Sequence, residues 1–526
     1  MRDSPSTSGP LSLPDGARVG RAVPGAREAF PWEAVVRATG SPGVPGNDVH
    51  LQFEGSSTFD RWLEAIAGAE RFVHFENYIL RDDPVGRAFR DALVAKARAG
   101  VPVRVLYDWM GCWATGRRYW RPFREAGVQV RAFNRPRLRD PWGILQRDHR
   151  KLVCVDGELA FVGGFCVGVE WAGDATNPPW RDTGVEIRGP AAALATQAFE
   201  RIWASQGSAV PVDLHAHPRT VANRGRTPVW IIQGEPGRSR VYRTLQLTAA
   251  HAARRLWITD PYFVAPRPVS QALAAAAEEG VDVRILLPAH NNWPWVGSLS
   301  RAGYRGLLEA GVRLFEWQGP MIHAKTSVMD GLWCRVGSSN INTASLLGNW
   351  EIDVGVVDEA LAGQLEGLFL ADLASAVEIV LPGARPGAAV QGEAPTPVAP
   401  LDPEGTLPER LTRGMRRRER TGGPVLRISD VVRAGSLFGD ALAGRRPLGR
   451  EDRTVLGTVA VFLLPLAVLS AIFPGVAGWA LAVLLGWLGG TAGARAALEA
   501  VRARRGRDGD RERGENPPEQ EAQPRG

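Results

Sequence analysis

The feature that most constrains the fold of this chain is an internal duplication of alternating helices and strands. The predicted elements of the first copy are 58–69, 71–79, 86–99, 101–108 and 128–133, and those of the second are 241–254, 255–263, 269–279, 281–287 and 312–316. Strands that alternate with helices predict an α/β fold. Two copies in one chain predict a catalytic body with pseudo-twofold symmetry.

Each copy closes with the same pattern, HxKxxxxDG, followed by an apolar strand that ends in small residues. The candidate catalytic residues in these patterns are His149, Lys151, Asp156, His323, Lys325 and Asp330. The chain has 60 Arg but only three Lys, and two of these lysines fall in the motif. An ammonium is a compact point charge, whereas a guanidinium is a broad planar fork. The use of Lys in such an Arg-rich chain indicates that Arg could not replace Lys in the motif.

The spacing predicts how these groups would act. His and Lys lie two residues apart on a strand, so they face the same side. Two such copies around a twofold axis would form a cationic pocket for a phosphodiester. A neutral His can attack phosphorus, a protonated His can supply a proton, and Lys can stabilise the developing charge. Asp156 and Asp330 each precede Gly and fit a turn role better than proton transfer. No metal or cofactor is predicted.

The duplicated motif resembles that of the phospholipase D superfamily, and further segments resemble its bacterial cardiolipin synthase branch. These segments are 75–83, 103–108, 180–183 and 337–351. The resemblance covers about 45–385 and implies two tandem α/β/α sandwich repeats. It also implies a two-step transfer in which one His becomes a phosphohistidine and the other moves protons. We favour His149 as the nucleophile and His323 as the acid/base, although the near-symmetry leaves the order open.

The resemblance also implies supporting residues. Asp182 and Glu351 occupy equivalent places in the two copies and are expected to accept hydrogen bonds from the histidine rings. The expected phosphate-binding residues are Gly164, Ser338, Ser339 and Asn340. In the first copy Cys166 stands where Asn is expected, which leaves the contact from that half-site in question.

A charge-free segment of 41 residues runs from Thr454 to Ala494. Its length suits two transmembrane helices, near 454–473 and 476–494, with Pro474 and Gly475 at the turn. Arginines flank both ends, so both ends are expected in the cytoplasm. The alternative is a buried hairpin in a soluble domain. The resembling bacterial enzymes usually carry such a hairpin at the N-terminus.

The predicted organisation follows from these segments. The domain ranges are 1–25 (disordered lead), 26–218 (first repeat), 219–385 (second repeat), 386–453 (Pro/Gly/Arg-rich linker), 454–494 (two transmembrane helices) and 495–526 (charged disordered tail). The four cysteines show no pairing pattern, which favours a reducing compartment.

The net charge of +7 suits an anionic partner. With the resemblance, it predicts a membrane-anchored phosphatidyltransferase that joins two phosphatidylglycerols into cardiolipin and glycerol. The predicted location is the bacterial inner membrane, with the catalytic region facing the cytoplasm. A hydrolase that releases phosphatidic acid, a nuclease of the same superfamily and a non-catalytic scaffold are the alternatives. The hairpin argues against nucleic acid as a partner. The acceptor alcohol, the acyl preference and the oligomeric state stay open.

Overall fold

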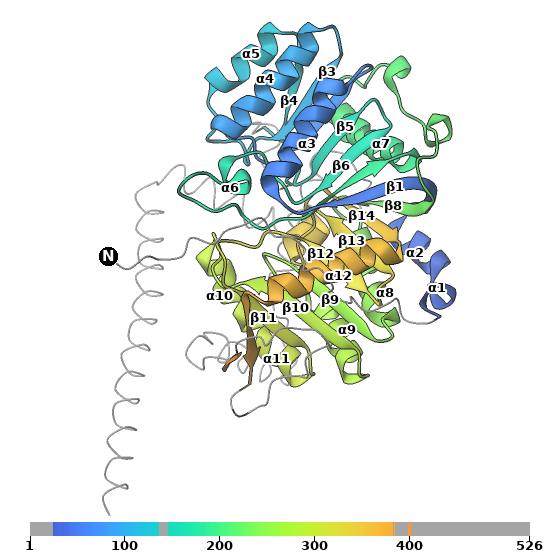
Figure 1. Ribbon diagram of the computed structural model, residues 1–526, viewed down its shortest axis with the longest axis vertical. Coiled ribbons are helices and arrows are strands. Elements are labelled where there is room, and N and C mark those ends of the chain that lie inside the picture. The colour runs from blue at the N-terminus through green and yellow to red at the C-terminus, as the bar shows by residue number, and fades with distance from the viewer. Residues whose placement is uncertain (1–24, 136–145, 382, 384–397, 401–526) are drawn as a thin grey trace, which may run out of the picture. The chain divides into compact units, whose positions relative to one another are not determined.

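Sixteen strands form one hydrogen-bonded sheet in the computed structural model, which describes residues 25–135, 146–381, 383 and 398–400 (Figure 1). The elements up to residue 220 are α1 (Ala26–Ala29), α2 (Trp32–Thr39), β1 (Val44–Gln52), α3 (Gly55–Gly68), β2 (Val73–Asn77), α4 (Pro84–Arg98), β3 (Val103–Asp108), α5 (Arg117–Glu125), β4 (Gln129–Phe133), β5 (Lys151–Val155), β6 (Leu159–Gly163), α6 (Val169–Ala172), β7 (Gly184–Arg188), α7 (Pro190–Ser205), η2 (Val212–Leu214) and η3 (Pro218–Thr220).

The second half repeats this plan. Its elements are β8 (Thr227–Gly234), α8 (Arg240–His251), β9 (Arg255–Thr259), α9 (Arg267–Glu278), β10 (Asp282–Pro288), α10 (Pro294–Ala302), α11 (Tyr304–Glu309), β11 (Arg313–Trp317), β12 (Thr326–Met329), β13 (Trp333–Gly337), the π-helical turn η4 (Ala344–Gly348), β14 (Glu351–Val357), α12 (Glu359–Leu373), β15 (Ala376–Val380) and β16 (Val398–Pro400).

The strand order reveals the pseudo-twofold relation between the repeats. The order is β4-β3-β2-β5-β6-β7-β1 in the first repeat and β11-β10-β9-β12-β13-β14-β8 in the second, with β15 and β16 added at the outer edge. The antiparallel pair β1 and β8 joins the two halves. Every helix and strand predicted within the duplicated copies is present, so the α/β repeat prediction is confirmed.

Local sequence signals explain where the helices begin. Asp83 accepts a hydrogen bond from the Gly86 N–H at 2.8 Å, and Pro84 follows it in the first turn of α4. Asp358 caps α12 in the same way through the Leu361 N–H at 2.9 Å. A carboxylate at the N-cap satisfies one of the free donors of the first helical turn.

The largest hydrophobic core belongs to both repeats at once. It includes alanines of α7, among them Ala195 and Ala198, together with Ile352 and Val354 of β14 and Leu365 of α12. Helix α7 contacts β1, β5, β6 and β7 of its own repeat and β8 of the other, while α12 contacts β1 as well as β12 and β13. The small side chains of α7 allow this close approach, so the two repeats share one interior.

Two predicted boundaries need correction. Helix α2 packs on α8 and β8, so residues 26–39 contact the second repeat although the first repeat was predicted to start at 26. The segment 386–453 was predicted to be a linker, but it contains strand β16, which pairs with β15. The predicted lead up to residue 24, the hairpin at 454–494 and the tail at 495–526 lie outside the described residues. Among the described residues, no helix is long and apolar enough to cross a bilayer.

Candidate active site

Both motif histidines lie at the same edge of the sheet, just before a central strand. Lys151 opens β5 and pairs with Asn77, the last residue of the antiparallel β2. In the second repeat Thr326 opens β12 and pairs with Thr259, the last residue of β9. The histidines therefore lie beside the carboxyl ends of the parallel strands, where loops from both repeats converge.

The backbones of the two repeats hold each other at this edge. The peptide groups of Trp350 exchange two hydrogen bonds with segment 147–149, at 2.8 and 2.9 Å. Those of Arg181 exchange two with segment 321–323, at 2.8 and 2.6 Å. The backbone at each histidine is thus hydrogen-bonded to the opposite repeat. Trp350, just before β14, holds the His149 segment, and Arg181, just before β7, holds the His323 segment.

The carboxylates cross between repeats in the same way. Glu351 of the second repeat lies with Oε2 3.1 Å from Nδ1 of His149. Asp182 of the first repeat lies with Oδ2 2.7 Å from Nδ1 of His323. Because a carboxylate accepts from an N–H, we assign the ring proton to Nδ1 in both histidines, which leaves Nε2 of the neutral ring with its lone pair. Lys325 Nζ also lies 3.0 Å from Nδ1 of His323, but the contact with Asp182 is shorter.

Further donors orient these two carboxylates. The Ser338 hydroxyl donates to Glu351 Oε2 at 2.6 Å, and the Ser345 hydroxyl donates to Glu351 Oε1 at 2.5 Å. Both serine oxygens also accept a backbone N–H, so their protons are directed at Glu351. The Trp171 indole N–H donates to Asp182 Oδ2 at 2.9 Å. Neither carboxylate can rotate without losing these bonds.

The two lysines are buried beside the histidines. Each ammonium donates to the carbonyl of the histidine two residues earlier in its own motif. Lys151 lies 5.0 Å from the centre of the Tyr78 ring, and Lys325 lies 5.9 Å from that of Tyr262. Burial, opposed in part by Asp182, lowers the pKa of Lys325 to about 8. Two closely held cations would attract a phosphodiester anion.

Burial also favours the neutral form of both histidines. It lowers the pKa of His149, against an opposing effect of Glu351. It lowers the pKa of His323 to about 3, and the charge of Lys325 acts in the same direction. In the described part of the chain, no group of three His, Cys, Asp or Glu side chains is arranged to hold a metal ion.

The structure does not bring the motif aspartates to the histidines. Asp156 and Asp330 follow the far ends of β5 and β12, with φ of 55° and 54°. The Asp156 carboxylate accepts three backbone N–H groups of residues 70–72, and Asp330 accepts three of residues 253–255. Asp156 and Asp330 therefore do not contact the histidines and were wrongly included among the candidate catalytic residues. They bind the turn after each motif strand to the start of the neighbouring strand.

The four expected phosphate-binding residues divide into two kinds. Gly164 packs against Asp182, where a Cβ would overlap the carboxylate, and the Ser338 hydroxyl is used by Glu351. By contrast, the Ser339 hydroxyl and the Asn340 Oδ1 are buried without a hydrogen-bond partner among the described residues. These two polar atoms have no partner among the described residues, and their contact with a substrate stays a prediction.

Sequence reasoning assigned no role to several neighbours of the histidines. The Tyr78 ring centre lies 4.8 Å from that of His149, and the Tyr262 ring centre lies 5.9 Å from that of His323. Both tyrosines follow equivalent strands, so an alignment of the repeats was the signal that could have found them. The Trp171 ring beside His323 has no counterpart of its type that a repeat alignment could reveal. Cys166 is buried, and burial raises the pKa of its thiol.

Comparisons with known proteins identify the family of the chain. The family model described as "Cardiolipin synthase, PLD-like domain" matches residues 62–203 and 246–373. Cardiolipin synthase A of Pseudomonas aeruginosa (strain LESB58) is 34% identical over 351 residues, 66% of this chain and 71% of the relative. Cardiolipin synthase A of Pseudomonas fluorescens (strain SBW25) is 36% identical over 341 residues, 64% of this chain and 71% of the relative.

A solved structure supports the fold. The phosphatidylserine synthase of Haemophilus influenzae Rd KW20 aligns with a TM-score of 0.52 at 13% identity, over 74% of this chain and 98% of that one. The fold and the paired histidines define an enzyme of the phospholipase D superfamily. Within it, the chain belongs to the cardiolipin synthase family of phospholipase D-like proteins. Its activity is that of a cardiolipin synthase-like phosphatidyltransferase.

Proposed function

We propose that the enzyme joins two phosphatidylglycerol molecules into cardiolipin and glycerol through a covalent phosphohistidine. The observation that carries the proposal is the reciprocal pairing of each histidine with a carboxylate of the other repeat, at 3.1 and 2.7 Å. Two equivalent imidazoles, each with a buried lysine beside it, suit a reaction of two similar steps, since one ring can bond to phosphorus while the other carries the proton.

In the first step, the Nε2 lone pair of His149 attacks the phosphorus of phosphatidylglycerol. The bond from phosphorus to the glycerol oxygen breaks, and that oxygen takes a proton from Nε2 of His323. His323 enters this step as an imidazolium, protonated on both ring nitrogens, a form that Asp182 and the bound phosphodiester anion stabilise. Glycerol leaves, and the phosphatidyl group stays on His149. Lys151 and Lys325 stabilise the negative charge of the non-bridging oxygens in the transition state.

In the second step, a hydroxyl of another phosphatidylglycerol enters. His323, now neutral, removes its proton while the oxygen attacks phosphorus, and the bond to His149 Nε2 breaks. Cardiolipin is released and both imidazoles return to their starting state. Water in place of the lipid hydroxyl would give phosphatidic acid, so the outcome depends on excluding water from the phosphohistidine.

The assignment of His149 as nucleophile is supported by the difference between the two carboxylate contacts. Asp182 lies 0.4 Å closer to its histidine than Glu351 does, and the same Asp182 oxygen is held by Trp171. A short, well-oriented carboxylate contact stabilises an imidazolium. The acid must be an imidazolium before the first step begins, whereas the nucleophile gains positive charge only as it attacks, so the shorter contact suits the acid.

Lipid mass spectrometry tests the overall reaction. The purified full chain is incubated with phosphatidylglycerol vesicles, and cardiolipin and glycerol are expected to form together. His149→Ala and His323→Ala should abolish the product, while His50→Ala, on the exposed face of β1, should not. Phosphatidic acid as the sole product would establish a hydrolase, and no lipid product would exclude both lipid reactions.

A second experiment separates the roles of the two histidines. A phosphatidyl ester of p-nitrophenol has a leaving group that needs no proton from the enzyme. With this substrate His323→Ala should still release a burst of p-nitrophenol and form the phosphohistidine, whereas His149→Ala should do neither. The reverse pattern would exchange the two roles.

We also propose that the segment 454–494 anchors the enzyme in the inner membrane with the catalytic body in the cytoplasm. The support is the absence of charge over its length and the arginines at both ends. Reporter fusions at residue 450 and at residue 500 should both be active in a cytoplasmic reporter and silent in a periplasmic one. A periplasmic signal from either fusion would exclude the hairpin.

A further inference from the structure

Four of the large exposed apolar side chains of the described residues lie just after two equivalent strands. Met110 and Trp113 follow β3, and Trp293 and Leu299 follow β10. Trp113 is 74% exposed and Trp293 is 55% exposed, which is unusual for indole side chains. The two repeats thus present exposed tryptophan at pseudo-symmetric places.

Both loops are hydrogen-bonded to the surroundings of the motif histidines. The Asp108 carboxylate accepts the N–H groups of Met110 and Gly111 on one oxygen, at 2.9 Å, and the Asp148 N–H on the other, at 3.0 Å. Asp148 directly precedes His149. The loop after β3 is therefore fixed to the catalytic segment of the first repeat.

The second repeat has its own link of this kind. The Tyr262 hydroxyl donates to Asn292 Oδ1 at 2.8 Å, and Asn291 donates to the Pro261 carbonyl at 2.8 Å and accepts the Trp293 N–H at 2.8 Å. Since the Tyr262 ring faces His323, the loop that carries Trp293 is also beside the site. The exposed tryptophans flank the catalytic edge, one from each repeat.

A cationic cavity adjoins the first of these loops. It has a volume of about 430 Å³ and is lined by Tyr107, Val128, Val130, Ala132 and Trp120 together with the side chains of Arg117, Arg124 and Arg135. The Tyr107 and Trp120 rings are stacked at 4.1 Å. The Trp120 indole also donates to the Thr115 carbonyl at 3.3 Å, which joins the cavity to the Trp113 loop.

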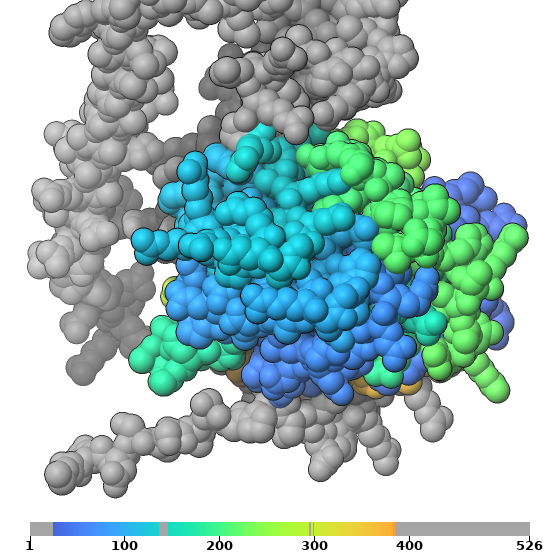
Figure 2. Space-filling view, turned by 90° about the horizontal axis from the view of Figure 1, so that it is seen from above, coloured from blue at the N-terminus to red at the C-terminus, as the bar shows by residue number. Residues whose placement is uncertain are grey.

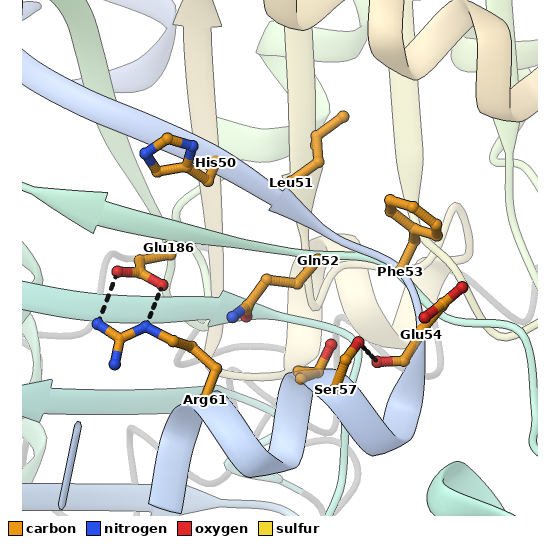
Figure 3. A pocket seen from close by; sticks show the side chains of 9 residues that line it. His50, Leu51, Gln52, Phe53, Glu54, Ser57, Arg61 and Glu186 are labelled. Carbon is orange, nitrogen blue, oxygen red and sulfur yellow. Dashed lines mark hydrogen bonds and ion pairs between the residues drawn. The ribbon is translucent and has the colours of Figure 1, made fainter. Parts of the chain in front are cut away.

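The arginines of this cavity are open to an anion. No Asp or Glu lines the cavity, and within the described residues its three arginines form no ion pair. The cavity of about 230 Å³ between β1 and α3 is different (Figure 3). There Arg61 is held by both oxygens of Glu186, each at 3.0 Å, so its charge is already neutralised.

We propose that the catalytic edge docks on the bilayer through Trp113 and Trp293, and that the arginine cavity holds the phosphate of an anionic phospholipid. This site is lined by residues of the first repeat between 107 and 135 and is separate from the histidine pair. Figure 2 shows the first repeat largely in blue and cyan. Tryptophan is favoured at the membrane interface, and guanidinium forks match phosphate oxygens. The inference rests on the proposed lipid substrate.

Fluorescent labelling tests the docking. All four native cysteines are buried, so an introduced cysteine can be labelled selectively. Trp113→Cys and Trp293→Cys in the full chain are labelled with a polarity-sensitive dye and mixed with phosphatidylglycerol vesicles that contain a spin-labelled quenching lipid. Both emissions should shift to the blue and be quenched. Val212→Cys, 82% exposed on η2, is the control and should remain unquenched. Water-like emission at position 113 would overturn the proposal.

Arginine variants test the cavity. The triple variant Arg117→Gln, Arg124→Gln and Arg135→Gln should raise the KM for vesicular phosphatidylglycerol by about a hundredfold, since each such charge contributes about fivefold. Activity on a short-chain, water-soluble phosphatidylglycerol should be unchanged. The charge-matched control is Arg219→Gln, Arg226→Gln and Arg243→Gln, all exposed elsewhere.

The two possible failures can be told apart. An equal rise of KM in the charge-matched control would show that any three surface arginines have this effect. That result would overturn the proposal that the cavity binds the phosphate. Loss of activity on the soluble substrate would place these arginines in the reaction rather than in docking. If the wild type formed no cardiolipin while the labels were still quenched, docking would stand and the proposed function would fall.

Discussion

Glu351→Gln is the sharpest test of the crossed active site, because the altered residue belongs to the second repeat and its effect should appear on His149 of the first. The carboxylate lies 3.1 Å from the His149 ring and accepts hydrogen bonds from Ser338 and Ser345. Glutamine preserves the size of the side chain. It removes the charge and turns one acceptor into a donor that faces a serine hydroxyl.

The magnitude follows from the distance. At 3.1 Å and an effective dielectric constant of about 20, a carboxylate stabilises a unit positive charge by about 5 kcal/mol. In the proposed reaction, attack on phosphorus places that charge on the ring of His149. A neutral amide keeps about 1 kcal/mol of hydrogen bonding. The remaining 4 kcal/mol or so corresponds to a fall of about 10³-fold in the rate of phosphohistidine formation.

Rapid-quench trapping of the phosphohistidine with labelled phosphatidylglycerol measures this rate directly. A purely structural defect would change the melting temperature and the amount of active enzyme, but not the rate per active site. Ser345→Ala is the control, since it removes one donor and retains the charge, and it should lose less than about tenfold. A well-folded Glu351→Gln enzyme within tenfold of the wild-type rate would refute the reasoning.

Three further predictions concern the lysine, the turn and a close contact. The pKa of Lys325 is lowered to about 8, so its positive charge is present below pH 8 and lost above it. The KM for phosphatidylglycerol should therefore rise about tenfold per pH unit above 8. A KM that stays flat to pH 9.5 would contradict this. Asp156→Ala should cost about 2–3 kcal/mol in thermal unfolding, because three backbone N–H groups lose their acceptor, while kcat per folded enzyme stays within about threefold. Gly164→Ala should displace Asp182 and lower kcat at least about tenfold, whereas Gly68→Ala on α3, where a Cβ meets no atom within 4 Å, should be neutral in the same assay.

The repeat architecture could be predicted because its signals are local. Apolar strands such as 103–108 and capped helices such as 84–98 are each encoded within fewer than twenty residues. The same pattern, found twice, then fixed the relation between the halves. Strands β1 and β8 were not predicted, although they join the repeats. Their pairing is long-range, and β1 contains Pro45 and Gly46, which weaken the strand signal.

The arrangement within the site was only partly predictable. Asp182 and Glu351 could be chosen as partners of the histidine rings because they are equivalent in the repeats. Their exchange between repeats could not be predicted, since spacing along the chain carries no information about which half lies opposite. Asp156 shows the reverse problem, because a residue within a motif can be required for the turn that presents the motif rather than for the chemistry.

The crossed contacts at Trp350 and Arg181 have a consequence for how such a chain can change over time. Each half carries one motif histidine, but the carboxylate that contacts this histidine belongs to the other half. Neither half-site is therefore complete without the other half. A change in one half must be matched by a change in the other. The two copies of the repeat therefore depend on each other, and neither of them is a spare copy.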